Sequence, residues 1–476
     1  MNTHNSRDTR RDFLRNASCA ALSAAGLRAG LGKLGLLSLH ASADPLAPTD
    51  FKALVCISLS GGCDGNNVVI PNDTTGYAAY ASARSAASLA IPQAQLLSIT
   101  PPRLGTAFGL NPGLAAIHPL FAGGQLAVAC NVGTLVQPLT RAQYQSGGAR
   151  PYQLFSHSDQ VIQYQTARSD VKTQTGWGGL VADEVRSQNG GSAYPVVTSV
   201  AGTQVYGQGA ITKPLAIAAA PTALNQVLVL SGFNASAESV ARRAAMDQLR
   251  TQDRSAVLIA SSSDAMQQAL DISAAFATDP VLTTVFPTTG IGNQLKQVAK
   301  VIKLNQTAAQ LSLNRMIFFA QLGGFDTHSN QITDQGNRLT ELANALKAFY
   351  DATVELGVAN RVTSFTLSDF GRTLQPSGSG GSVGSDHGWG NHQLVLGGAV
   401  RGGDFYGVNG PNGSPYPQLT LGGPNDTDSR GRWIPTASVD QYAATLATWF
   451  GVPAAQLGTV FPLLSRFSTP DLGFML

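Results

Sequence analysis

Three short glycine-rich stretches of this chain carry acidic residues and histidines that could bind a metal ion. Each lies next to a hydrophobic run that is typical of a β-strand. Carboxylates together with imidazoles are typical ligands of zinc or manganese, whereas calcium and magnesium rarely take histidine. The residue types therefore predict a divalent-metal site, with zinc or manganese favoured and calcium or magnesium left open. The candidate ligands are Asp64 in the first stretch, Asp326 and His328 in the second, and Asp369, Asp386 and His387 in the third.

The spacing of Asp326 and His328 supports this interpretation. One residue separates them, so in an extended loop both side chains point to the same side and could share a cation. A single Asp after Gly is more often a turn or cap residue than a ligand, and a lone His is more often structural. The joint occurrence at three strand ends is what favours a metal site.

Other polar residues near these stretches could take part in catalysis. Ser156 and His157 are adjacent, but neighbouring side chains seldom face each other productively, and the chain lacks the G-x-S-x-G elbow of a triad hydrolase. Arg372 and Arg401 could each hold an anionic substrate group. A surface salt bridge is the alternative for both arginines.

Alternating strands and helices must position these loops. Hydrophobic runs predict strands over residues 51–59, 125–131, 315–322, 361–367 and 393–397, and helical spacing predicts helices over 77–89, 180–186, 337–356 and 439–450. Such a pattern indicates an α/β protein, in which loops at strand ends hold the chemistry. Helical patterns over 236–277 and 291–314 predict an insertion, mixed and helical, at about 189–314. The remainder, 44–476, is expected to form one domain.

The first 43 residues are typical of a twin-arginine signal peptide. Arg10 and Arg11 precede a mildly apolar run, and a small-x-small pattern ends at Ala43. The alternative is an exposed arginine pair at the start of an ordinary helix. We expect export by the twin-arginine machinery to the periplasm or beyond, and no later segment is apolar enough to span a bilayer.

Composition and cysteine content narrow the class further. Charged residues are 12% of the chain and the net charge is +3, so the surface is polar but weakly charged and no basic cluster predicts nucleic-acid binding. Cys56, Cys63 and Cys130 would remain after signal cleavage, and at most one disulfide could form. A Cys63–Cys130 bridge is expected only if both residues follow adjacent strand ends.

These residues resemble an exported bacterial family called domain of unknown function 1501. The family is distantly similar to the alkaline phosphatase and sulfatase superfamily. That resemblance implies a mixed, mainly parallel central sheet flanked by helices, with a divalent-metal site at its strand ends. The motifs that carry it, besides the arginine pair, are residues 59–67 (LSGGCDGNN), 155–159 (FSHSD), 323–328 (GGFDTH), 368–373 (SDFGRT), 384–388 (GSDHG) and the tail from Arg430 to Gly451.

The resemblance also implies roles for individual residues. Asp64 would match the first-strand metal ligand, Asp326 and His328 the acid and histidine pair, Asp369 the acid of an Asp-His dipeptide, and His387 the late histidine. Phe370 stands where the superfamily has the histidine of that dipeptide. One of two metal positions is therefore weakened, and Asp386 or His157 could substitute. No sulfatase signature is present, and Ser156 is the candidate nucleophile.

Two functions follow from these expectations. The first is a metal-dependent hydrolase of phosphate or sulfate esters, acting on a small-molecule or polymer substrate outside the cytoplasm, in which the metal would activate Ser156 or a water molecule. The second is a catalytically inactive, metal-stabilised binding or matrix protein.

Overall fold

The fold is built around β1 (Lys52–Leu59), an apolar strand that is hydrogen-bonded on both sides. Its neighbours β8 (Arg315–Leu322) and β9 (Val362–Ser368) run parallel to it. Seven of the eight residues of β1 are buried, as expected for a central parallel strand covered on both faces. The computed structural model describes residues 51–190, 192, 194–229, 232–308, 311–378 and 382–476. The predicted signal peptide lies outside the described residues.

These strands belong to a nine-stranded sheet with the order β13-β5-β12-β9-β1-β8-β6-β7, in which β14 also pairs with β5. β12 runs antiparallel to both neighbours, whereas the other described pairs are parallel. The expectation of a mixed, mainly parallel sheet is confirmed. Its remaining strands are β5 (Leu126–Gly133), β6 (Val197–Ser199), β7 (Leu215–Ala216), β12 (Asn391–Gly397), β13 (Phe405–Tyr406) and β14 (Ala437–Ser438).

This topology places several loops at one edge of the sheet. The carboxyl ends of β1, β5, β8 and β9 lie there because these strands share one direction. The amino end of β12 lies there too because β12 is antiparallel. The sheet therefore brings together the loops that the sequence singled out, as is usual for open α/β sheets.

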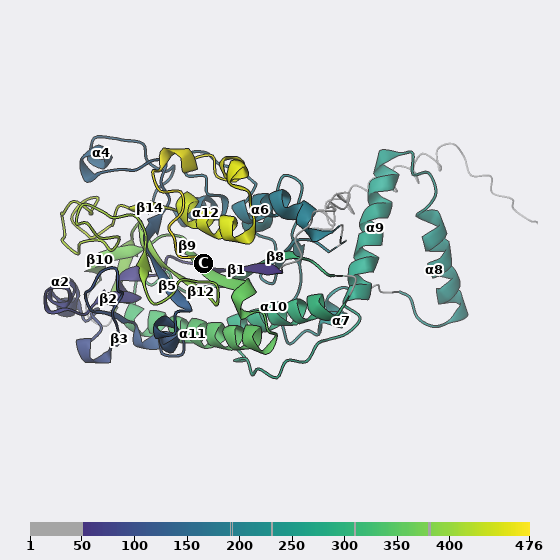
Figure 1. Ribbon diagram of the computed structural model, residues 1–476, viewed down its shortest axis with the longest axis horizontal. Helices are drawn as coiled ribbons and strands as arrows, with labels where there is room; N and C mark the ends of the chain where they lie inside the picture. The colour runs from purple at the N-terminus through teal and green to yellow at the C-terminus, as the bar shows by residue number, and fades with distance from the viewer. Residues whose placement is uncertain (1–50, 191, 193, 230–231, 309–310, 379–381) are drawn as a thin grey trace, which may run out of the picture.

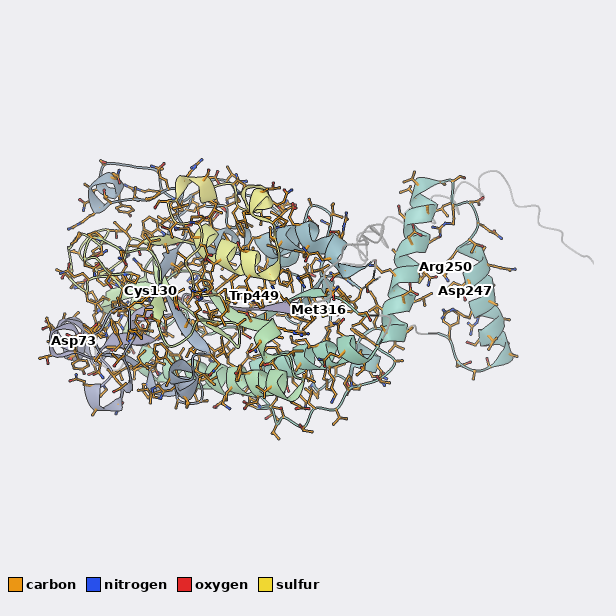
Figure 2. The ribbon with its side chains drawn as sticks, in the orientation of Figure 1. Asp73, Cys130, Asp247, Arg250, Met316 and Trp449 are labelled. Carbon is orange, nitrogen blue, oxygen red and sulfur yellow. The ribbon has the colours of Figure 1, made fainter. Side chains whose placement is uncertain are left out.

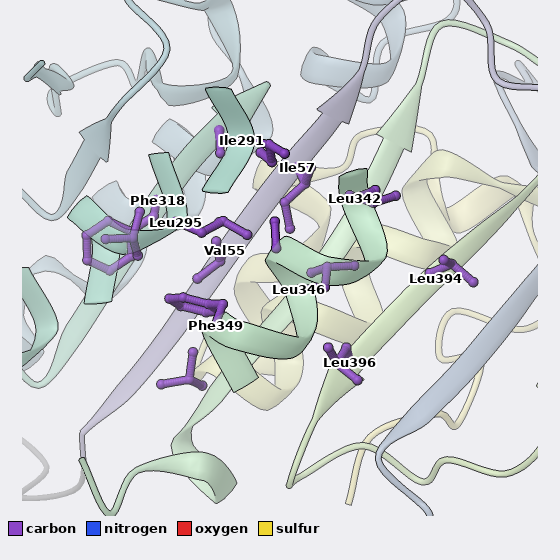
Figure 3. Close-up of a cluster of buried hydrophobic side chains, with 14 of the residues drawn as sticks. Val55, Ile57, Ile291, Leu295, Phe318, Leu342, Leu346, Phe349, Leu394 and Leu396 are labelled. Carbon is purple, nitrogen blue, oxygen red and sulfur yellow. The ribbon is translucent and has the colours of Figure 1, made fainter. Parts of the chain in front are cut away.

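Helices cover both faces of the sheet (Figure 1). Val55 and Ile57 of β1 belong to the core shared with α10 (Gly290–Thr307) and α11 (Gln331–Glu355), as the close-up in Figure 3 shows. Leu54 and Cys56 belong to the core on the opposite face, with α6 (Trp177–Val185) and α12 (Val439–Phe450). The alternation of side chains along the strand thus feeds two separate cores.

The sequence predicted these helices from periodicity and stop signals. On α11 the apolar residues Leu339, Leu342, Leu346 and Phe349 are all buried, which confirms the predicted face. α12 begins with a capping box at Ser438 and ends at Gly451, whose φ of +115° suits glycine.

The segment predicted as an insertion, at about 189–314, has several parts. β6 and β7 extend the central sheet, α7 (Leu224–Val227) is short, and α10 packs on the sheet. α8 (Ala237–Leu249) and α9 (Val257–Ala275) form a helical pair that projects from the body in Figure 1. Figure 2 places Asp247 and Arg250 on this pair, where they form an ion pair of 2.6 Å.

Smaller elements complete the described fold. β10 (Arg372–Ser377) and β11 (Gly384–His387) form an antiparallel hairpin, and β2 (Val69–Pro71), β4 (Phe108–Leu110) and β3 (Leu97–Ile99) form a small sheet. The other α-helices are α2 (Thr74–Arg84), α3 (His118–Ala122), α4 (Arg141–Gln145), α5 (His157–Thr166) and α13 (Leu457–Val460).

The structure also describes the cysteines of the described ranges and the lengths of their helices. Cys56, Cys63 and Cys130 are free, buried thiols. The conditional Cys63–Cys130 bridge is wrong because its condition fails: β9 and β12 lie between β1 and β5. Within the described ranges, no helix is both long enough and apolar enough to cross a membrane.

Candidate metal centre

Two histidines and a carboxylate converge at the edge of the sheet where the loops meet. His157 is the first residue of α5, Asp326 lies in the loop after β8, and His387 ends β11. Each offers one ligand atom, and these atoms all lie within 4.8 Å of one another. The Nε2 atoms of His157 and His387 are 3.1 Å apart, and they lie 3.4 and 3.7 Å from Asp326 Oδ1.

His328 approaches the same carboxylate. Its Nε2 lies 3.1 Å from Asp326 Oδ1 and 3.1 Å from His387 Nε2. The predicted pair Asp326 and His328 therefore lies side by side, as the one-residue spacing suggested. The Nε2 atoms of three imidazoles therefore face the carboxylate of Asp326.

The imidazole rings are oriented through their other nitrogen. His157 Nδ1 donates to Asp369 Oδ2 at 2.7 Å, and His387 Nδ1 donates to the carbonyl of Phe155 at 2.8 Å. Because a carboxylate and a carbonyl only accept, Nδ1 carries the proton in each neutral ring and Nε2 keeps its lone pair. This arrangement is the one that metal-binding histidines usually adopt.

The carbonyl that orients His387 belongs to a residue with an unusual backbone. Phe155 has φ of +71°, a left-handed conformation that bulky residues rarely adopt. Its N–H donates to Gln160 at 2.7 Å, and the guanidinium of Arg432 lies 5.1 Å from the centre of its ring. Arg432 Nε also donates to the carbonyl of His387 at 2.9 Å. Arg432 therefore contacts both partners of the Phe155–His387 hydrogen bond.

Arg372 lies behind the cluster and joins the loops. Its side chain is fully buried and forms an ion pair with Asp326. Its nitrogens donate to backbone carbonyls of three loops, so few donors are left for a substrate. These acceptors are Gly62 O at 2.9 Å, Ser385 O at 2.9 Å, Gly61 O at 2.6 Å and Phe325 O at 3.1 Å.

Neighbouring charges set the protonation of the cluster. Burial alone would raise the pKa of Asp326, but the Arg372 guanidinium outweighs it and holds that pKa below its usual value. The hydrogen bond to Asp369 raises the pKa of His157, and burial lowers the pKa of His387. With Nε2 atoms 3.1 Å apart, both rings cannot carry a proton there, so at least one lone pair faces the cluster.

Asp369 has an unused oxygen. The carboxylate is buried, and its Oδ2 accepts from His157 and from the Gly61 N–H at 3.0 Å. Its Oδ1 is buried and has no hydrogen-bond partner among the described residues. A buried carboxylate oxygen without a donor is costly, so this atom indicates a missing partner.

A cavity of about 420 Å³ adjoins the cluster. Three glycines, two serines and Val161 line it beside His157, Asp326 and Asp369. Gly61 is required in this wall because its φ is +113° and a Cβ would collide with the backbone nitrogen of Asp326. This close approach explains the first glycine of the Gly-Gly pair after β1, and the second lies against the Phe370 ring with φ of +76°.

Asp64 lies in a separate, closed network. Its carboxylate is fully buried and forms an ion pair of 2.5 Å with Arg84, which is also fully buried. The same carboxylate accepts from Asn66 and from Gln331. The structure therefore places Asp64 among internal donors and does not group it with His157, Asp326 and His387.

The remaining candidates lie around the cluster. Asp386 Oδ1 is 3.4 Å from His328 Nδ1, and its other oxygen pairs with Arg430 at 2.6 Å. The hydroxyl of Ser156 donates to Asp159 at 2.8 Å, and Ser156 is not part of the cavity wall. Asp386 could only assist the centre through His328, while Ser156 is engaged elsewhere.

Phe370 forms an apolar part of the wall beside His157 and His387. Its ring is fully buried, and its centroid lies 4.6 Å from those of His157 and His387. A phenyl ring at this place excludes a second ligand and packs the two imidazoles. An apolar ring therefore lies at the position where the resemblance implies a histidine.

The sequence pattern marks His157 less clearly than the other residues of the cluster, and it does not indicate the residues that support it. His157 was only a possible substitute, although the polar FSHSD motif marked it. Nothing in the sequence pattern indicated the parts of Phe155, Arg432 or Arg84, because each depends on contacts between segments far apart in the chain.

The chain belongs to a family described as "Protein of unknown function (DUF1501)", which it matches over residues 51–415. A search of curated proteins gives no match. Solved structures similar to the chain include the C-terminal periplasmic domain of EcEptC from Escherichia coli in complex with zinc, at 12% identity, with 76% of each chain covered and a TM-score of 0.29.

Two further similar structures are a sulfatase and a phosphatase. The PsFucS1 sulfatase from Pseudoalteromonas sp. is 10% identical, with 82% of this chain and 67% of that chain covered and a TM-score of 0.27. A mutant alkaline phosphatase of TAB5, an Antarctic bacterium, with bound magnesium is 9% identical, with 74% and 90% covered and a TM-score of 0.22. At these low identities and TM-scores, the similarity says nothing about the chemistry of this chain, which depends on its own residues.

Proposed function

We propose that His157, Asp326 and His387 bind a divalent metal ion, with His328 as a further ligand, and that the protein hydrolyses phosphate or sulfate esters there. The convergence of Nε2 and carboxylate oxygens carries this proposal. Zinc bonds of about 2.0–2.1 Å at tetrahedral angles separate ligand atoms by about 3.3 Å. The distances of 3.1–3.7 Å found here match such a shell.

The donor set favours zinc or manganese over calcium or magnesium. Imidazole suits the former, whereas calcium and magnesium prefer oxygen ligands. A divalent ion would supply Lewis acidity toward an ester oxygen or toward water. We leave Asp64 out of the ligand set because its carboxylate is fully buried and bonded to Arg84, Asn66 and Gln331. Asp326 also pairs with a buried arginine, but it is half exposed and faces three imidazoles.

Within this proposal the chain's own residues have separate tasks. Asp369 and Phe155 orient the imidazoles, and Arg372 holds the loops that carry the ligands. Ser156 is directed at Asp159, so we assign the attack to water and not to that hydroxyl. The twin-arginine signal would place this activity in the periplasm or outside the cell.

A second function has an observation in its favour. Phe370 removes one potential ligand, and a centre with one ion and no facing hydroxyl also fits a metal-stabilised binding protein without catalysis. The two proposals share the metal and differ in turnover.

The test is a panel of phosphate monoester, phosphate diester and sulfate ester substrates with zinc, manganese, magnesium or calcium added. We expect turnover with zinc or manganese that is lost in His157→Ala and His387→Ala. His118→Ala is the matched control, because His118 lies on α3 and its ring is hydrogen-bonded to the carbonyl of Ser98 on β3. Bound metal without turnover on any substrate would favour the binding protein.

A further inference from the structure

The cavity beside the proposed metal centre has an uneven distribution of charge. Its wall holds two carboxylates, Asp326 and Asp369, and no lysine or arginine among the residues that line it. Carboxylates accept hydrogen bonds and cannot donate them, so these two side chains make the wall a poor host for anionic oxygens. Any negative group of a substrate must therefore be neutralised mainly by the metal.

The nearby cations are already engaged. Arg372 is buried and bonded to three loops. Arg338 lies against Gly324 in the wall but pairs with Glu341 at 2.6 Å. Arg430 pairs with Asp386, and Lys172 pairs with Asp159 at 2.7 Å. Three of these four cations thus face a carboxylate of their own outside the cavity wall.

With the proposed ion bound, the positive and negative charges around the cavity nearly balance. Two wall carboxylates offset a divalent ion, and the buried Arg372 leaves one positive charge. The amino end of α5, whose first residues line the cavity, adds a partial positive charge. A single negative charge is therefore matched, whereas a second would face two carboxylates without a counterion.

We propose that the site selects monoanionic oxyacid esters, which are sulfate monoesters or phosphate diesters, over dianionic phosphate monoesters. This inference rests on the proposed metal centre and narrows its substrate class. The size of the cavity, about 420 Å³, is at the lower end of the range for small-molecule sites.

The kinetic test compares 4-nitrophenyl sulfate and bis(4-nitrophenyl) phosphate with 4-nitrophenyl phosphate at pH 8, where the last is a dianion. With the zinc-loaded protein we expect kcat/KM for the better monoanion to exceed that for the dianion on the order of tenfold. The two monoanions separate a sulfatase from a phosphodiesterase. A preference for 4-nitrophenyl phosphate would overturn the inference.

A binding test does not depend on turnover. Calorimetry with the zinc-loaded protein should give tighter binding of dimethyl phosphate, a monoanion, than of methyl phosphate, a dianion. If this order holds while no ester is hydrolysed, the charge selection stands and the proposed hydrolysis fails. If methyl phosphate binds more tightly, the charge selection fails whatever the activity.

Two variants of one cavity residue test whether the charge of the cavity wall causes the preference for monoanions. Val161 lines the cavity from α5 and is half-buried. Val161→Lys should shift both ratios toward the dianion on the order of tenfold, while Val161→Met, which is similar in length but neutral, should leave them unchanged. Equal ratios in the two variants would contradict the electrostatic origin.

Discussion

Two carboxylates that follow neighbouring strands meet opposite surroundings. Asp64, after β1, is fully buried and compensated by Arg84 and by amide donors. Asp326, after β8, is half exposed and faces three imidazoles. Both stretches have a Gly-Gly-x-Asp pattern. Each aspartate also pairs with a buried arginine, Arg84 or Arg372. The difference teaches that exposure and the neighbouring imidazoles, and not the local motif, distinguish an aspartate in a closed network from one that could bind an ion.

Breaking the buried Arg84–Asp64 ion pair should have the largest effect on stability. Arg84→Met leaves the Asp64 carboxylate buried without its counter-ion, so we expect a loss of about 3–5 kcal/mol in the free energy of unfolding. Urea unfolding measures it. Metal content should stay unchanged, because Arg84 belongs to the closed network.

The double variant Arg84→Met with Asp64→Leu controls for this interpretation. Removing both charges should restore part of the loss. A double variant that is less stable than Arg84→Met alone would show that the buried charge is not the cause.

The stability conferred by the cluster of His157, Asp326 and His387 should depend on bound metal. His157→Ala or His387→Ala removes a ligand, and we expect zinc affinity to fall at least about 100-fold, which corresponds to about 2.7 kcal/mol. Chelator should then lower the Tm of the unmodified protein and leave that of the variants nearly unchanged.

Asp64→Asn is the matched comparison for this cluster. It should keep the response to chelator, although its stability is lower. Loss of that response in Asp64→Asn, with retention in His157→Ala, would reverse the roles that we give to the two regions.

Removing Arg432, which supports His387, should have a smaller effect on zinc affinity. Arg432→Met removes the contacts with the His387 carbonyl and with the Phe155 ring. We expect zinc affinity to fall about tenfold, in the lower part of the range for residues that orient ligands. Competition with a chromogenic chelator measures it, and Arg430→Met, which removes the ion pair to Asp386, serves as comparison.

The smallest effect at neutral pH concerns His392, at the start of β12. Burial lowers its pKa to about 3, against about 6.5 in an unfolded chain. The unfolded state therefore binds a proton between these values while the native state does not, so the stability contributed by neutral His392 is complete above pH 6.5 and is lost as pH falls toward 3.

His392→Gln should flatten that pH dependence. The free energy of unfolding, measured in chelator from pH 7 to pH 4, should fall less steeply in the variant, by up to about 1.4 kcal/mol per pH unit. Identical slopes would mean that His392 binds its proton as readily in the native state as in the unfolded chain.

The sequence predicted the sheet well because burial leaves a direct mark in apolar runs. The strands at 51–59, 315–322 and 361–367 and the helix face of α11 follow from periodicity alone. The hairpin of β10 and β11 was not predicted, because its strands are short and mostly polar and therefore lack an apolar run.

The residues that the structure brings together could be anticipated in part for a similar reason. Asp326, His328 and His387 could be proposed because residue type and spacing are local properties. The separation of Asp64 could not, because it depends on Arg84, twenty residues away and on another element. The place of His157 depends on α5 returning to the sheet edge, which no local pattern encodes.

The most direct test is a crystal structure of the zinc-loaded protein with anomalous data collected at the zinc edge. The account predicts one anomalous peak within about 2.0–2.2 Å of His157 Nε2, His387 Nε2 and an Asp326 carboxylate oxygen. A peak at Asp64, or no peak with the two Nε2 atoms joined through a shared proton, would contradict it.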